Sequence, residues 1–260
     1  MTSRSERDAV AVGAVDWGFE RRVARPCAAL ADVVESLWVI RWHAPPDGRV
    51  VHAPADACAH LLHRAGRLVL RGPSTLARRR PASGGDVVGV RIRPGALRVL
   101  LGLDPRIVVN ETVDVTTLDG AQELLAALAR VELLDRVPLL EAFLLARRRG
   151  RIDVRVAAFL AGEDPGLGAR QLRRVIVRET GLTPKLHARI GRARAAINAL
   201  SRETRIAEVA RACGYADQAH LTRELGAMLT MPPAAWLRRG PGACPFSSRP
   251  EEIEPPESEA

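Results

Sequence analysis

One stretch near the C-terminal end restricts the fold of this chain more than any other. Residues 204–226 read TRIAEVARACGYADQAHLTRELG. Apolar residues recur there at helical spacing on both sides of a glycine, which predicts two short helices. These apolar residues are Ile206, Val209, Ala210, Leu221 and Leu225. Gly214 suits a left-handed corner that other residues adopt only at a cost, and Asp217 stands where an N-cap residue belongs. The segment therefore predicts a helix-turn-helix.

Residues 152–181 repeat this plan with weaker turn chemistry. A first helix is predicted over residues 152–160, a connection rich in Gly and Pro over 162–168, and a second helix over 169–180 that ends at Gly181. One face of this second helix is apolar, and we expect it to be buried. The opposite face carries Arg170, Arg173, Arg174 and Arg178.

A long helix is predicted to join the two units. Thr183 is a capping residue and Pro184 follows it at the first helical position, which marks a helix start. The helical pattern then continues to about Leu200. Residues 151–240 are therefore expected to form an all-α domain.

The first part of the chain has a different pattern. Short apolar runs, separated by turn residues, predict strands at 33–42, 50–54, 59–63, 67–71 and 87–92. After Pro94-Gly95 the spacing becomes helical, which predicts helices at 96–102, 119–130 and 132–148. We expect an α+β protein: a small antiparallel β-barrel or sheet with helices, followed by two helix-turn-helix units joined by a long helix.

Charge and composition support four regions along the chain. Residues 1–20 are predicted to be a flexible lead, and residues 21–148 a sensory or self-association domain. Residues 151–240 hold 16 Lys and Arg against 8 Asp and Glu, so most of the formal net charge of +9 lies there. Such a basic block is typical of a phosphate-binding surface. Residues 241–260, rich in Pro, Ser and Glu, are predicted to be a disordered acidic tail.

Several functional classes are not expected. Cys27, Cys58, Cys213 and Cys244 match neither a zinc pattern nor a disulfide framework, which fits a reduced cytosol. Four histidines, His43, His52, His60 and His63, lie near Cys58 in sequence, but we favour ordinary histidines over a metal site there. The sequence indicates no catalytic constellation and no cofactor. It also contains no signal peptide and no membrane-spanning run, so a cytoplasmic protein is expected.

Two helix-turn-helix units joined by a long helix resemble the AraC/XylS family of transcription activators. The matching segments are RQLRRVIVRETGLTPK at 170–185, RARAAINAL at 192–200, IAEVARACGYADQAHLTREL at 206–225 and PPAAWLRR at 232–239. Residues 50–105 also resemble the N-terminal domain of a subgroup of these regulators.

The resemblance implies a set of DNA-contacting residues, because the second helix of each unit enters a major groove in that family. The candidates for contact with base edges are Arg170, Arg173, Arg174, Gln218, His220 and Arg223. The candidates for phosphate contact are Thr183, Lys185 and Thr222. Arg can bind guanine with two hydrogen bonds and Gln can bind adenine likewise, each worth roughly 1–3 kcal/mol of discrimination. His220 has an alternative role, which is to cover the turn.

The resemblance also implies partners and leaves alternatives open. Double-stranded DNA is the expected partner of a sequence-specific transcription activator, and RNA polymerase, a small-molecule effector and a second copy of the chain are further candidates. One alternative is a DNA-targeted enzyme such as an alkyl-acceptor repair regulator, although it would need a reactive cysteine cluster and only Cys27 and Cys58 lie upstream. Another is a protein-interaction module that has lost DNA binding.

Overall fold

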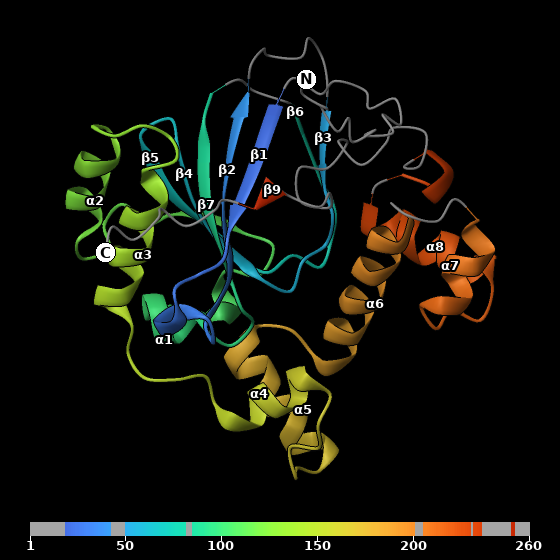
Figure 1. The fold of residues 1–260 in the computed structure, drawn as a ribbon. Helices are drawn as coiled ribbons and strands as arrows, with labels where there is room; N and C mark the ends of the chain where they lie inside the picture. Colours follow the sequence, from blue (N-terminus) through green and yellow to red (C-terminus); the bar gives the residue numbers. More distant parts are fainter. Residues whose placement is uncertain are drawn as a thin grey trace, which may run out of the picture.

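The computed structural model describes residues 19–42, 50–81, 85–200, 205–229, 231–235 and 251–252. The first half of the chain is built on a seven-stranded sheet with the order β8-β5-β4-β7-β2-β1-β9, beside a two-stranded ribbon of β3 and β6 (Figure 1). The strands are β1 (Phe19–Ala24), β2 (Val34–Trp42), β3 (Val50–Ala53), β4 (Ala59–Arg64), β5 (Arg67–Arg71), β6 (Arg78–Pro81), β7 (Val87–Ile92), β8 (Thr112–Asp114) and β9 (Glu251–Glu252). All neighbouring strands pair antiparallel except β1 and β9, which pair parallel.

Local chemistry explains the centre of this sheet. β7 is rich in valine and lies between β2 and β4, so both of its edges are paired. β4 and β5 form a hairpin in which Arg64 pairs with Arg67. The two residues between them, Ala65 and Gly66, have φ values of 48° and 72°, as a tight hairpin turn requires.

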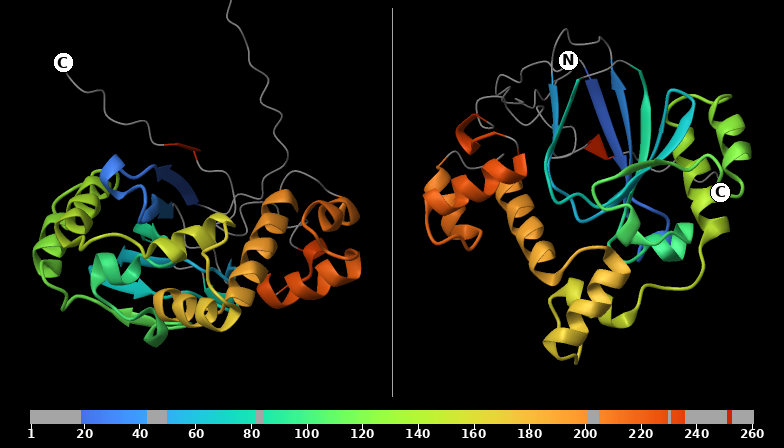
Figure 2. Two further views of the ribbon diagram at one scale, coloured as in Figure 1. Left: turned by 90° about the horizontal axis from the view of Figure 1, so that it is seen from below. Right: turned by 180° about the vertical axis from the view of Figure 1, so that it is seen from behind.

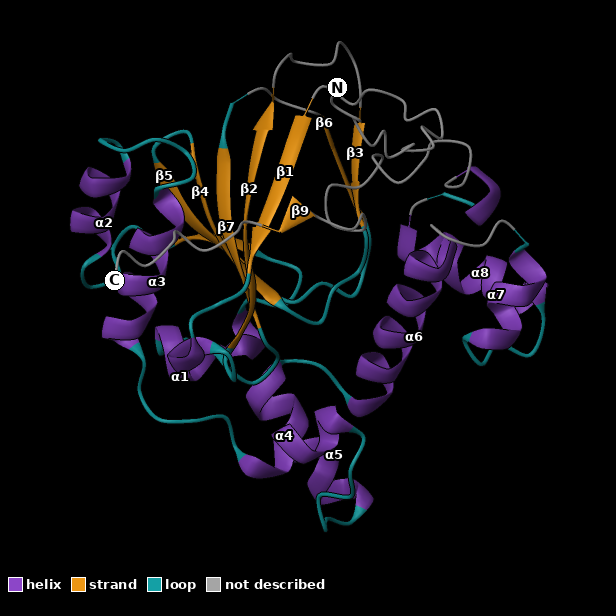
Figure 3. Ribbon diagram, in the orientation of Figure 1, coloured by secondary structure: helices purple, strands orange, loops and turns teal. Residues whose placement is uncertain are grey.

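Helices cover one face of the sheet and enclose the main apolar core (Figure 3). They are η1 (Ala28–Leu30), α1 (Leu97–Leu101), η2 (Pro105–Ile107), α2 (Ala121–Leu128) and α3 (Arg136–Arg147). α1 ends at Gly102, whose φ of 69° is the left-handed conformation that glycine adopts most readily. Leu140 and Leu144 of α3 are fully buried against this core.

The second half of the chain is helical. Its helices are α4 (Val154–Ala161), α5 (Ala169–Thr180), α6 (Pro184–Leu200), α7 (Ile206–Ala212) and α8 (Gln218–Leu229). Figure 1 shows α4 and α5 near one end of α6, and α7 and α8 near the other. The turned views of Figure 2 show the same helices beside the sheet domain.

The predicted α+β fold is confirmed, with an open sheet in place of a barrel and with two helix-turn-helix units joined by a long helix. β1, β6 and β8 were not predicted as strands. β1 begins at Phe19, inside the predicted flexible lead, and β9 lies inside the predicted acidic tail. The remainder of both segments lies outside the described residues. No helix in the described part of the chain is long and apolar enough to cross a membrane.

Candidate nucleic-acid interface

The turn of the second unit is formed as its sequence predicts. Gly214 has a φ of 72°, and the chain then turns so that the backbone N–H of Tyr215 donates to the Ala210 carbonyl oxygen at 2.9 Å. Tyr215 is buried in the core of this unit. Asp217 accepts a hydrogen bond from the backbone N–H of His220 at 2.6 Å, which caps the start of α8.

Polar contacts tie α8 to the long helix α6. The Glu224 carboxylate of α8 lies 3.1 Å from Arg192 and 3.4 Å from Arg189, both on α6. The Tyr215 hydroxyl donates to the same carboxylate at 3.2 Å. Burial, with Glu224 adding to it, raises the pKa of Tyr215 to about 12. The hydroxyl therefore stays protonated and keeps this hydrogen bond.

The first unit is built more loosely. Its own apolar core contains three buried residues, Val156 of α4 with Val175 and Ile176 of α5. The connection over residues 162–168 is longer than the turn of the second unit, and Gly168 precedes α5 without a side-chain cap. At the far end of α5, the Thr180 hydroxyl donates to the Ile176 carbonyl oxygen at 2.7 Å.

The predicted base-reading residues of α5 lie on its exposed face. Arg170, Arg173 and Arg174 are exposed, and within the described part of the chain they form no ion pair. Arg178 differs, because it lies 2.6 Å from Glu179. Lys185, at the start of α6, is also exposed. Three cations on α5 are therefore available to a negatively charged partner.

The corresponding face of α8 is less basic. Gln218 and Arg223 are exposed, whereas His220 and Thr222 are half-buried. The His220 ring packs edge-on against Tyr215 with ring centroids 5.2 Å apart. Its Nδ1 accepts a long hydrogen bond from the Ala216 backbone N–H, at 3.4 Å. This geometry favours the alternative role of His220, which is to cover the turn.

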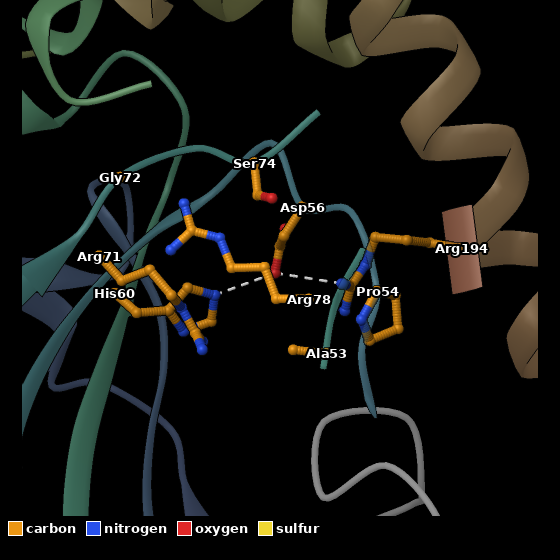
Figure 4. Close-up of a pocket in the computed structure, with 9 residues that line it drawn as sticks. All are labelled: Ala53, Pro54, Asp56, His60, Arg71, Gly72, Ser74, Arg78 and Arg194. Carbon is orange, nitrogen blue, oxygen red and sulfur yellow. Dashed lines mark hydrogen bonds and ion pairs between the residues drawn. The ribbon is translucent and has the colours of Figure 1, made fainter. Parts of the chain in front are cut away.

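Sequence reasoning missed a buried polar cluster around Asp56, in the loop before β4. Its carboxylate lies 2.9 Å from His60, 2.9 Å from Arg91 and 3.1 Å from Arg194 (Figure 4, which draws His60 and Arg194). Burial alone would raise the pKa of Asp56, but Arg194 and Arg91 hold it well below its usual range. Arg194 belongs to α6, so this carboxylate links the two halves of the chain.

The cysteines in the described residues do not form a reactive or metal-binding centre. No group of three or more His, Cys, Asp or Glu side chains in that part of the chain is arranged to hold a metal. Cys58 is buried, and burial raises the pKa of its thiol. Its Sγ lies 3.2 Å from the Glu35 carboxylate. Because the thiolate is the reactive form, Cys58 is poorly suited to accept an alkyl group.

A cavity of about 720 Å³ lies between the sheet domain and the helical domain. Glu35 and Arg91 line it from the sheet domain, and Phe159 and Ile190 line it from α4 and α6. Most of its wall is apolar, and it also includes the charged side chains of Asp32, Glu35, Asp56, Arg91, Arg93 and Arg194. Its size is within the range of small-molecule sites, roughly 300–1,000 Å³.

Comparisons with known proteins match both halves of the chain. Residues 163–239 match a family described as a helix-turn-helix domain, and residues 22–114 match a domain of unknown function (DUF6597). No curated protein matches the chain in sequence. Among solved structures, an apo variant of ToxT from Vibrio cholerae strain SCE256 is 10% identical, with a TM-score of 0.42 over 85% of this chain and 97% of that one. ToxT from Vibrio cholerae O395 is 11% identical, with a TM-score of 0.37 over 85% and 98% of the two chains.

Proposed function

We propose that this chain, whose residues 163–239 match a helix-turn-helix domain, is a DNA-binding transcription regulator of the AraC type, and that α5 and α8 enter neighbouring major grooves of DNA and read its sequence. The observation that carries this proposal is the exposed, unpaired basic face of α5 together with the capped and rigidly supported α8. Arg173 and Arg174 supply donors for guanine, and Gln218 and Arg223 supply donors for base edges in the second groove.

The length of α6 supports this arrangement. It contains 17 residues, and such a helix is about 25 Å long. The two recognition helices stand beside its opposite ends (Figure 1). Neighbouring major grooves on one face of DNA are about 34 Å apart. A helix of this length keeps the two recognition helices apart, as helices that enter separate grooves require.

Phosphate contacts are proposed at the start of α6 and on α8. Thr183 accepts a hydrogen bond from the Leu186 backbone N–H at 3.3 Å, so its side chain caps α6. Lys185 follows two residues later and is exposed, and Thr222 lies beside the exposed face of α8. Such contacts set the register of the protein on DNA without reading its sequence.

Selection of bound genomic fragments, followed by fluorescence anisotropy on the enriched sequence over a salt series, tests the proposal. We expect the affinity to fall steeply as salt rises, because phosphate contacts release counterions. Lys185→Ala should weaken binding to all sequences evenly, and Arg130→Ala, at an exposed position two residues after α2, serves as the control. Absence of an enriched sequence, or binding that ignores salt, would contradict the proposal.

We also propose that a small-molecule effector occupies the cavity between the domains, since its walls come from both. A panel of metabolites screened by thermal shift tests this. Ala157→Trp should fill the cavity from α4 and abolish any shift, whereas Ala126→Trp, exposed on α2, should retain it. A shift that survives Ala157→Trp would place the effector elsewhere. Activation, contact with RNA polymerase and self-association stay predictions from the resemblance.

A further inference from the structure

The first helix-turn-helix unit is docked on the sheet domain at the end of α5. Gly181, which follows α5, has a φ of 79°, and a Cβ atom there would lie 2.7 Å from Val109 Cγ2 and 2.9 Å from the Pro105 carbonyl oxygen. Both contacts belong to the sheet domain. Only a glycine leaves room for this approach, so the segment 105–109 is seated directly on the turn between α5 and α6.

Two further contacts support this docking. Arg98 of α1 lies 3.8 Å from Glu179 of α5 and 2.8 Å from Asp104 of its own domain. In the turn before α1, a Cβ atom at Gly95 would lie 3.0 Å from Val156 of α4. Val156 is one of the three buried core residues of the first unit. Both helices of the first unit therefore rest on the sheet domain.

The second unit is docked on another part of the sheet domain. The backbone N–H of Ala55 donates to the Met228 carbonyl oxygen, near the end of α8, at 3.2 Å. Ala55 is buried in the core of the second unit although it belongs to the sheet domain. The next residue, Asp56, pairs with Arg194 of α6 at 3.1 Å (Figure 4).

Hydrogen bonds within the sheet domain hold in place the residues that make these contacts. Backbone hydrogen bonds join Asp56 and Ser74 in both directions, at 2.9 Å and 2.7 Å. Arg91 of β7 also pairs with the Asp56 carboxylate, at 2.9 Å. The segment 105–109 is fixed as well, because the backbone N–H of Asn110 donates to the Pro73 carbonyl oxygen at 2.7 Å. The two docking places are thus joined through neighbouring residues of one segment, Pro73 and Ser74.

We propose that the sheet domain is a brace that sets the spacing and relative orientation of the two recognition helices, with Gly181 and Arg194 as positioning residues. This inference rests on the proposed function, because it specifies how the two helices are held for DNA. The loose core of the first unit makes the brace necessary: α5 depends on residues outside its own unit for its placement. A braced pair of helices accepts one separation of half-sites and rejects others.

The test compares Gly181→Ala with Gly162→Ala in the full chain. Both glycines end a helix of the first unit with a left-handed φ, 79° and 80°, but only at Gly181 would a Cβ atom meet the sheet domain. Gly162→Ala therefore controls for backbone strain. Arg194→Met is a second variant, because Asp56 keeps Arg91 and His60 as partners after that change.

The readout is affinity for the selected DNA site and for versions with one base pair inserted or removed between the half-sites. One base pair rotates the half-sites relative to each other by roughly a tenth of a turn. For the native chain and Gly162→Ala we expect the altered sites to bind about tenfold more weakly, which corresponds to about 1.4 kcal/mol. For Gly181→Ala and Arg194→Met we expect that ratio to shrink to about threefold or less. A simple loss of folded protein would lower all affinities together and leave the ratio unchanged.

A measurement without DNA separates this inference from the proposed function. Spin labels at Gln171→Cys on α5 and Ala219→Cys on α8, both exposed, are placed on a chain whose four native cysteines are alanine. Pulsed electron resonance should give a narrow distance distribution that broadens in Gly181→Ala and in Arg194→Met. Unchanged distributions and an unchanged spacing ratio in both variants would overturn the brace, whereas a native chain with no preferred DNA sequence would overturn only the proposed function.

Discussion

The first and second helix-turn-helix units share a plan but differ in what holds them. The second unit has a tight turn at Gly214, a capped helix α8 and a core that it shares with α6. The first unit has a long connection, an uncapped α5 and a core of three buried residues. Its recognition helix α5 has the more basic exposed face, and the unit contacts the sheet domain at Gly181 and through Arg98.

The two units therefore differ in what each would contribute to the proposed recognition of DNA. The second unit holds its recognition helix mainly against α6, because Glu224 of α8 pairs with Arg192 and accepts a hydrogen bond from Tyr215. Ala55 of the sheet domain adds one backbone hydrogen bond, to Met228 of α8. The first unit brings more charge and less internal support, so its orientation depends on contacts that belong to another domain.

The largest expected effect is on core packing. Leu221→Ala, at a fully buried position of α8, should lower the free energy of unfolding by about 2–5 kcal/mol, because it leaves a cavity. Leu172→Ala in α5, at a half-buried position, should lower it by roughly 1 kcal/mol. Urea unfolding of both variants checks this. Equal losses would show that the cores of the two units are packed equally well.

The pH dependence of stability should come in part from the joint between α5 and α6. Burial lowers the pKa of His187 from 6.5 to about 4, and its Nε2 lies 2.8 Å from the Thr180 hydroxyl. Between pH 6.5 and 4 the unfolded chain binds a proton that the folded chain does not, so stability present at pH 7 is lost as the pH falls. The loss amounts to as much as about 3 kcal/mol.

His187→Gln isolates this contribution, because glutamine keeps a donor for Thr180 and does not titrate. We expect the stability of the variant to change less between pH 7 and pH 4 than that of the native chain, by urea unfolding at fixed ionic strength. His60, whose pKa is lowered to about 3 by burial, titrates in both proteins and cancels in the difference. If the stability of the variant and that of the native chain change equally with pH, His187 is not held neutral in the folded chain.

Base reading should differ between the units in a measurable way. Arg173→Ala and Arg223→Ala should each cost about 1–3 kcal/mol on the selected site and relax specificity in one half of it only. Competition binding against single-base variants of the site measures both effects. If Arg173→Ala weakens every sequence evenly, α5 contacts phosphates alone, and only the second unit reads bases.

The smallest expected effect concerns helix caps. Asp217→Ala removes the cap of α8 and should cost about 1 kcal/mol. Gly168→Ser should add a cap to α5, where a Cβ atom has open space, and should stabilise the chain by a few tenths of a kcal/mol, up to about 1. Thermal unfolding of these two variants tests whether α5 lacks the N-terminal cap that α8 has. A stabilising Asp217→Ala or a destabilising Gly168→Ser would contradict this account.

Sequence patterns were sufficient for the helices of the second unit. Helical spacing of Leu221 and Leu225, the corner at Gly214 and the cap at Asp217 are local features, and each stands in the structure as predicted. Strands were harder. β6 contains Arg78, Arg79 and Arg80, which do not alternate with apolar residues, and it is a strand because β3 lies beside it.

The sequence by itself determined the two helix-turn-helix units, since short-range spacing and turn chemistry decide which residues of a helix are buried and where it begins and ends. The tertiary structure alone decided how those units are held. Gly181 is recognisable in the sequence as a helix end, but its close approach to Val109 is not. Nor does any periodicity pair Asp56 with Arg194, 138 positions further along the chain. Such contacts join segments that only the folded chain brings together, and they leave no repeating pattern in the sequence.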